Sequence, residues 1–120
     1  MKAGMSIRLK RVYEPFAKAD GLRILVDRLW PRGVTKVAAH IDVWCKDAAP
    51  SPALRTWFGH DPARWNEFRE RYFIELQAQT GAVAELRALA ATQPVTFVYA
   101  AKDSEHTHAL ALKAFVEALK

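Results

Sequence analysis

Four stretches of the chain carry the hydrophobic pattern of β-strands. Residues 22–26 form a nearly continuous apolar run, which is typical of a strand covered on both faces. Residues 95–99 are β-branched or aromatic throughout and follow a proline. Residues 7–12 and 41–45 alternate with a period of two, as half-exposed strands do. The pattern therefore predicts four short strands.

Two helix starts are explicit in the sequence. Ser51-Pro52 and Asp61-Pro62 each place a side-chain acceptor at the N-cap and a proline at the first helical position, where the missing N–H costs nothing. The first start predicts a short helix that stops at Gly59. The second predicts a long helix whose apolar residues recur every three or four positions, namely Trp65, Phe68, Tyr72 and Leu76.

Helical patterns also occupy most of the remaining chain. Residues 35–39 predict one short turn, and Gly81 is expected to separate the long helix from another that ends before residue 94. A last helix is expected from about Glu105 to the end of the chain, with Asp103 or Ser104 as its cap.

The alternation of strands and helices sets the expected fold class. It predicts an α/β fold, a compact three-layer domain with a small, mostly parallel sheet flanked by helices. At 120 residues, the chain is expected to form a single α/β domain over residues 1–120.

Composition narrows the class of protein further. Hydrophobic residues make up 51% of the chain and charged residues 26%, which excludes a disordered protein. No apolar run approaches the roughly 20 residues that span a bilayer, and the first residues show no signal-peptide core. Cys45 is the single cysteine, so it forms no internal disulfide and is interpreted as a buried, inert thiol. These features predict a cytoplasmic protein that does not associate with a membrane.

Positive charge is concentrated toward the N-terminus. The net charge is +5, and residues 1–36 hold nine Lys and Arg against three acids, while the other 84 residues hold nine against ten. Such a one-sided field attracts phosphate-bearing partners. A solvated basic surface would have the same composition, so charge alone does not decide between the two.

The loop after the strand at 22–26 carries the densest group of reactive and charged side chains. It places Asp27, Arg28, Trp30 and Arg32 around a bend formed by a proline and a glycine. Arginine suits bidentate recognition of phosphate or carboxylate groups. The loop therefore predicts a site that handles anions.

A second strand exit repeats this pattern, because Lys102, Asp103 and Ser104 follow the strand at 95–99. In open α/β sheets, ligands bind at the carboxyl ends of the parallel strands. If the two strands are parallel neighbours, both loops lie at one edge of the sheet and contribute to one pocket.

Histidines are the candidates for proton transfer near neutral pH. His106 is preferred because it lies beside the second loop, in the first turn of the expected last helix. His60 is the second candidate, with a cap or turn role as its alternative. His106 and His108 are two residues apart and do not form the i, i+4 pair of a metal site, so neither a metal nor a cofactor is predicted.

A purely structural interpretation of these charges stays open. Asp27 could pair with an arginine of its own loop, and Lys102 with Asp103, which would fix both loops without any ligand. Trp30 is more often a packing anchor than a surface on which a ligand stacks.

Motifs along nearly the whole chain resemble the YeaO-like proteins, a bacterial branch of domain-of-unknown-function family 488. The matching segments are Arg11-Val12-Tyr13-Glu14-Pro15, Asp20-Gly21, Val26-Asp27-Arg28-Leu29-Trp30-Pro31-Arg32-Gly33, Asp42-Val43-Trp44, Ala49-Pro50-Ser51, Trp57-Phe58-Gly59-His60-Asp61-Pro62 and Tyr99-Ala100-Ala101-Lys102-Asp103. The resemblance implies a small α/β protein of uncharacterised activity.

The chain departs from the usual pattern of this family at Ala48 and at Thr107, where an Asn commonly follows the histidine that matches His106. Longer relatives of the wider group carry a Cys-His-Arg triplet near residues 106–108, which this chain lacks. A reaction that depends on that cysteine is therefore not implied here, and Cys45 does not replace it in sequence.

Three hypotheses of function follow. The leading one is a protein that binds a small phosphate- or carboxylate-bearing ligand, with nucleotides among the candidates, at the carboxyl edge of its sheet. An alternative is a nucleic-acid-binding module that uses the basic N-terminal third, with Arg8, Lys10 and Arg11 on phosphates. The other is a non-catalytic structural or partner-binding protein.

The leading hypothesis assigns a role to each candidate residue. The expected ligand contacts are Arg28, Trp30, Arg32, His60, Lys102 and Ser104, and the acid–base candidates, should a reaction occur, are Asp27, Asp103 and His106. The sequence leaves open the identity of the ligand, the occurrence of a reaction and the oligomeric state.

Overall fold

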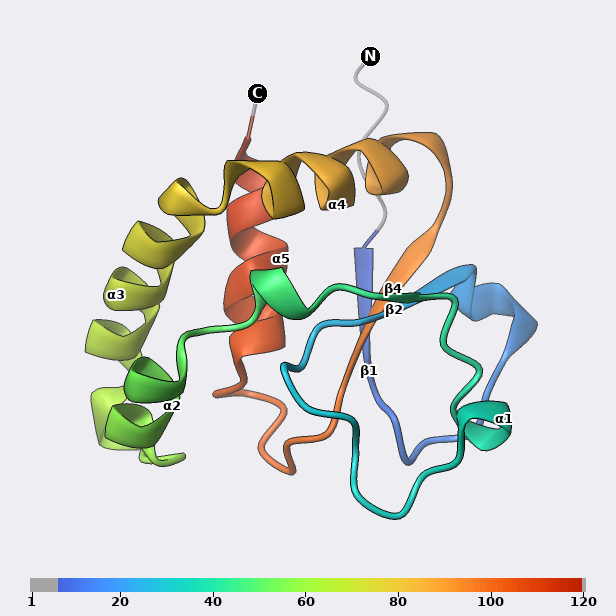
Figure 1. The fold of residues 1–120 in the computed structure, drawn as a ribbon, viewed down its shortest axis with the longest axis horizontal. Coiled ribbons are helices and arrows are strands. Elements are labelled where there is room, and N and C mark those ends of the chain that lie inside the picture. The colour runs from blue at the N-terminus through green and yellow to red at the C-terminus, as the bar shows by residue number, and fades with distance from the viewer. Residues whose placement is uncertain (1–6, 120) are drawn as a thin grey trace.

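The computed structural model describes residues 7–119, which form an α/β fold (Figure 1). Its strands are β1 (Ile7–Arg11), β2 (Leu22–Leu25), β3 (Val43–Trp44) and β4 (Val95–Tyr99). Its α-helices are α1 (Lys36–Ala39), α2 (Pro52–Phe58), α3 (Trp65–Ala78), α4 (Thr80–Thr92) and α5 (His108–Ala118). Lys2, one of the nine basic residues counted above, lies outside the described residues.

The sheet is parallel throughout and has the strand order β1-β4-β2-β3. Strand β4 therefore lies between β1 and β2, where Phe97 pairs with Leu9 on one side and Ile24 on the other. All five residues of β4 are buried, as its apolar sequence predicts. Because β2 and β4 are parallel neighbours, the loops that follow them leave the same edge of the sheet.

The sheet is covered on both faces, which confirms the predicted three-layer α/β architecture. In Figure 1, α2, α3 and α5 lie to one side of the strands, α4 crosses above them, and α1 lies to the other side. The larger core joins the helices to one face through residues such as Phe97 and Leu112. A smaller cluster on the other face contains Val12, Ala39 and Val98.

A buried ion cluster lies on the face that α1 covers. Arg23 is 1% exposed and forms an ion pair with Asp20, and it also donates to two backbone carbonyl groups at the end of α1. Lys10 Nζ lies 3.0 Å from Asp20 Oδ1. Burial alone would raise the pKa of Asp20, but hydrogen bonds from the Ala17 N–H, Lys10 and Arg23 outweigh it and lower that pKa. Lys10 and Arg23, two of the basic residues that are concentrated toward the N-terminus, thus form ion pairs inside the fold.

Several element boundaries differ from the expected ones. Asp61 caps a single 3-10 turn, and α3 begins only at Trp65. The break between α3 and α4 falls at Gln79, while Gly81 lies inside α4. The expected strand at 41–45 is reduced to the two residues of β3. The reason is that the Arg23 N–H donates to the side chain of Asp42, whereas in a longer strand it would donate to a backbone carbonyl group.

The start of the last helix was the largest error of the sequence-based prediction. Helix α5 begins at His108 with Thr107 as its N-cap, so His106 precedes the helix and neither Asp103 nor Ser104 caps it. The Asp103 carboxylate instead accepts the N–H groups of Glu105 and His106 at 2.9 and 3.2 Å. Aspartate side chains readily form such local turns, which here delay the helix.

None of the helices within residues 7–119 has the length and apolar character needed to cross a membrane.

Candidate functional site

A cavity of about 650 Å³ opens at the carboxyl edge of the sheet, and we call it the basic cavity. Its wall includes residues 27–32 after β2, 100–103 after β4, and 106–108 at the start of α5. Residues 49–50, part of α2, and the single residues Tyr13, His60 and Phe68 complete it. In Figure 1 the loops after β2 and β4 lie on the lower side of the sheet, as does α2.

Most of the sequence-predicted site residues meet in this cavity. The side chains that line it include Asp27, Arg28, Trp30, Arg32, His60, Lys102, Asp103 and His106. Ser104 is exposed and lies outside this set. The expected convergence of two strand exits thus agrees with the geometry, while the roles assigned to the residues stay predictions.

Asp27 and His108 form an acid–base pair at the inner end of the cavity. Asp27 Oδ2 accepts the Ala100 N–H at 3.0 Å, and Oδ1 lies 3.3 Å from His108 Nε2. The same Nε2 lies 3.0 Å from the Val26 carbonyl oxygen, so it faces two acceptors and carries a proton. Burial raises the pKa of Asp27 and lowers the pKa of His108. The pairing of Asp27 with an arginine of its own loop, left open by the sequence, is therefore wrong.

A second acid–base pair lies nearer the surface. His106 Nδ1 is 2.8 Å from Asp103 Oδ2, and this hydrogen bond lowers the pKa of Asp103. The ring of His106 also meets the edge of Trp65 at 5.6 Å between centroids. These contacts orient the imidazole, and Nε2 has no hydrogen-bond partner within residues 7–119. Asp103 is thus paired with a histidine, and the alternative pairing with Lys102 is wrong.

Trp30 is held by its neighbours. Its Nε1–H donates to the Val34 carbonyl oxygen at 2.6 Å, and its ring meets Trp44 edge-on at 5.3 Å. Trp44 in turn donates from Nε1 to the Asp27 carbonyl oxygen at 2.8 Å. The two indoles therefore pack against each other and hold the backbone of the loop after β2 through their hydrogen bonds. Trp30 also contributes to the wall of the cavity.

Cationic side chains in the cavity have no carboxylate partners. Arg28, Arg32, Arg55 and Lys102 form no ion pair with any residue of the described chain. Arg28 donates weakly to two backbone carbonyl groups at 3.3 and 3.4 Å, and its Nε is buried without a hydrogen-bond partner in the same residues. The cavity therefore carries uncompensated positive charge, to which the N-terminus of α5 adds.

The structure adds residues that the sequence-based site does not contain. Arg55 and Phe58 enter the cavity from α2, and His108 pairs with Asp27. Phe58 lies in the same family motif as His60, a predicted site residue. This motif was the one sequence feature that could have placed the end of α2 at the site. No motif marks Arg55. The role of His108 depends on where α5 begins, and that boundary was predicted wrongly.

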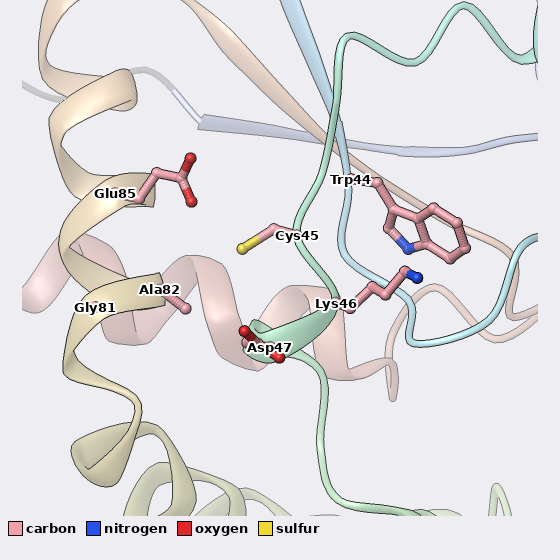
Figure 2. Close-up of a pocket in the computed structure, with 7 residues that line it drawn as sticks. All are labelled: Trp44, Cys45, Lys46, Asp47, Gly81, Ala82 and Glu85. Carbon is pink, nitrogen blue, oxygen red and sulfur yellow. The ribbon is translucent and has the colours of Figure 1, made fainter.

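A second cavity, of about 480 Å³, lies beside α4, and we call it the Cys45 cavity. Figure 2 shows the Cys45 sulfur pointing toward α4 and Glu85, while Trp44 and Lys46 extend away from it. Burial raises the pKa of the Cys45 thiol to about 11, and the carboxylates of Glu85 and Asp47 add to this shift. The expected burial of Cys45 is confirmed. Residues 7–119 hold no cluster of three or more His, Cys, Asp or Glu that could bind a metal.

Comparison with known proteins identifies relatives over nearly the whole chain. A family model described as "Inactive DUF488-N3 subclade" matches residues 6–120. The uncharacterised protein YeaO of Escherichia coli (strain K12) is 42% identical over 115 residues, which cover 96% of this chain and 100% of that protein. An uncharacterised protein of Mycobacterium tuberculosis is 45% identical over 106 residues, 88% of this chain and 89% of its own. No solved structure matches the chain. The chain belongs to the YeaO-like proteins of the DUF488 family, in the subclade described as inactive.

Proposed function

We propose that this protein binds a small phosphate- or carboxylate-bearing molecule in the basic cavity. One observation carries the proposal: four cationic side chains line the cavity without a carboxylate partner in residues 7–119, while the cavity's Asp27 and Asp103 are both engaged by histidines. The description of the subclade as inactive agrees with binding as the main role.

Arg28 is the central residue of this proposal. Its buried Nε lacks a hydrogen-bond partner in the described chain, and an unpaired buried donor costs roughly 1–3 kcal/mol. A small shift of the guanidinium group toward a bound anion would recover part of this cost. Arg32 and Lys102 are exposed and would close around the anion from the two strand-exit loops.

The nucleic-acid alternative has weaker support. Lys10 is paired with Asp20, and Arg8 and Arg11 donate to backbone carbonyl groups at 2.8 Å. These three side chains are the ones that would contact phosphates in that alternative, and their internal bonds would compete with such contacts. A module of that kind would also show a steep loss of affinity with salt, whereas a pocketed anion is less sensitive.

Isothermal titration calorimetry with orthophosphate, phenyl phosphate and benzoate tests the proposal. The double variant Arg32→Ala/Lys102→Ala is expected to weaken binding roughly tenfold, because it removes two exposed charge-assisted contacts. The matched control Lys18→Ala/Lys36→Ala removes the same charge at exposed positions that do not line the cavity, and it should leave affinity unchanged.

Two results would contradict the proposal. One is that none of the anions binds. The other is that both double variants weaken binding equally, which would mean that net charge, and not the cavity, attracts the anion.

A further inference from the structure

We propose that the ligand of the basic cavity is an aromatic anion, in which a phosphate or carboxylate group is attached to a flat ring that also carries a hydrogen-bond donor. This inference rests on the proposed function and names the class of ligand. It comes from the size of the cavity, from the way charge and burial are distributed along its wall, and from the polar pair at its inner end.

The size of the cavity argues against a bare inorganic anion. Its volume of about 650 Å³ falls in the range of roughly 300–1,000 Å³ that is typical of sites for small organic ligands. An orthophosphate ion would occupy a small part of this space and would leave the apolar wall hydrated.

Charge and burial follow opposite gradients in the cavity. Arg32 and Lys102 are exposed and lie where the cavity meets solvent, whereas Phe58 is 5% and Phe68 1% exposed. Of the four cations only Arg28 is half-buried, whereas a site built for an inorganic anion would bury its cations and surround the ion with them. This arrangement instead suits a ligand whose charged group stays at the mouth while an apolar body enters the cavity.

The buried wall favours an aromatic body. Phe58 stacks on Phe68 with ring centroids 4.3 Å apart, and Pro31 and Pro50 are buried in the wall of the same cavity. Aromatic rings gain from edge and face contacts with such neighbours beyond simple burial.

The polar groups at the inner end of the cavity favour a ligand ring that carries a hydrogen-bond donor. Asp27 and His108 are 17% and 16% exposed there, and Nε2 of the histidine already faces two acceptors. The Nε2 proton bonds to the Val26 carbonyl oxygen, and Asp27 Oδ1 is buried without a hydrogen-bond partner in the described chain. A purely apolar body would leave this carboxylate oxygen unpaired, whereas an N–H or O–H on the ligand would satisfy it.

Calorimetry with a graded set of ligands tests the inference on the unmodified protein. Phenyl phosphate is expected to bind at least tenfold more tightly than ribose 5-phosphate or orthophosphate. Either 3-aminophenyl or 4-aminophenyl phosphate should bind at least threefold more tightly than phenyl phosphate, because each adds one donor. Aminobenzoates compared with acetate test whether a carboxylate can serve as the anionic group.

A cavity-filling variant separates this inference from the proposed function. Ala101 lines the cavity and is partly buried against the core, so Ala101→Leu should abolish the advantage of the ring while orthophosphate affinity is retained. Ala84→Leu, at an exposed position of α4, is the matched control and should change neither. Thermal melting verifies that both variants fold.

The outcomes are distinguishable. If orthophosphate binds as tightly as phenyl phosphate, or if Ala101→Leu leaves the ring advantage intact, the aromatic assignment is overturned and the anion site stands. If neither amino isomer binds more tightly, the donor requirement is overturned. If no anion binds at all, the proposed function is overturned together with the inference.

Discussion

The basic cavity and the Cys45 cavity are both lined by charged side chains but differ in how these charges are balanced. Four cations of the basic cavity have no carboxylate partner in residues 7–119. In the Cys45 cavity, Asp47 and Glu85 surround the thiol, and the single cation, Lys46, extends toward Trp44, with Nζ 4.1 Å from the ring centroid. The first environment carries uncompensated positive charge, whereas in the second burial and two carboxylates raise the pKa of the thiol.

The position of each cavity in the sheet explains the difference. The basic cavity lies at the carboxyl ends of β2 and β4, the two central strands, where several loops bring side chains together. The Cys45 cavity lies beside the edge strand β3 and the flank of α4. A cavity with reactive residue types is therefore a weaker indication of function than a cavity in which like charges converge.

The largest expected effect concerns the reactivity of Cys45. With a pKa of about 11, the folded protein at pH 8 holds about two orders of magnitude less thiolate than an ordinary cysteine does. Alkylation by iodoacetamide should therefore be at least about 100-fold slower in the folded protein than in urea, as measured by mass spectrometry. Equal rates in the two states would show that the Cys45 cavity does not suppress the thiol.

A smaller effect is expected from removing one carboxylate in each cavity. Asp27→Ala leaves the Ala100 N–H without its acceptor and removes the carboxylate beside His108, so the free energy of unfolding should fall by roughly 1–3 kcal/mol. Asp47→Ala removes an exposed carboxylate and should change stability by less than about 0.5 kcal/mol. Urea denaturation of both variants checks this, and similar losses would contradict the contrast between the cavities.

The smallest expected effect is a pH dependence confined to the basic cavity. His108, whose pKa is lowered, gains a positive charge as the solution becomes acidic, and Asp27, whose pKa is raised, loses its negative charge. Both changes make the cavity more positive, and the lowered pKa of His108 puts its charge change below pH 6.5, so affinity should increase severalfold between pH 7 and pH 4.5. Phenyl sulfate is the suitable probe, because its own charge stays constant over this range.

A double variant tests whether the pH dependence of affinity comes from Asp27 and His108. His60→Gln/His106→Gln removes the other two histidines that line the cavity, and part of the increase in affinity should persist. If affinity falls on acidification, the directions given for Asp27 and His108 do not govern binding.

Much of the fold was predictable because hydrophobic periodicity is a local signal. The strands at 22–26 and 95–99 and the N-cap of α2 at Ser51 were expected within a residue of where they lie. The start of α5 was not, because Asp103 has two competing uses, as a helix cap or as the acceptor in a local turn. Only the packing of the loop decides between them.

The loops that form the candidate site were predictable from the sequence, but the partners of its charged side chains were not. Its two loops follow apolar strands, which the sequence shows directly. The partner of Asp27 is His108, 81 positions away, and the choice between this partner and a nearby arginine depends on burial and tertiary distance. Local sequence carries no information about either quantity, and for the same reason it did not identify Arg55.

The strand order has a consequence for how the chain acquires its structure. Because β4 lies between β1 and β2, β1 has no neighbour and β2 pairs only with the two-residue strand β3 until residue 95 has been synthesised. The sheet, and with it both strand-exit loops of the basic cavity, must therefore assemble through contacts between distant parts of the chain, which are slow to form because of the loops they close. A nascent chain that stops short of β4 leaves β1 unpaired and one edge of β2 open, and unpaired strand edges promote aggregation.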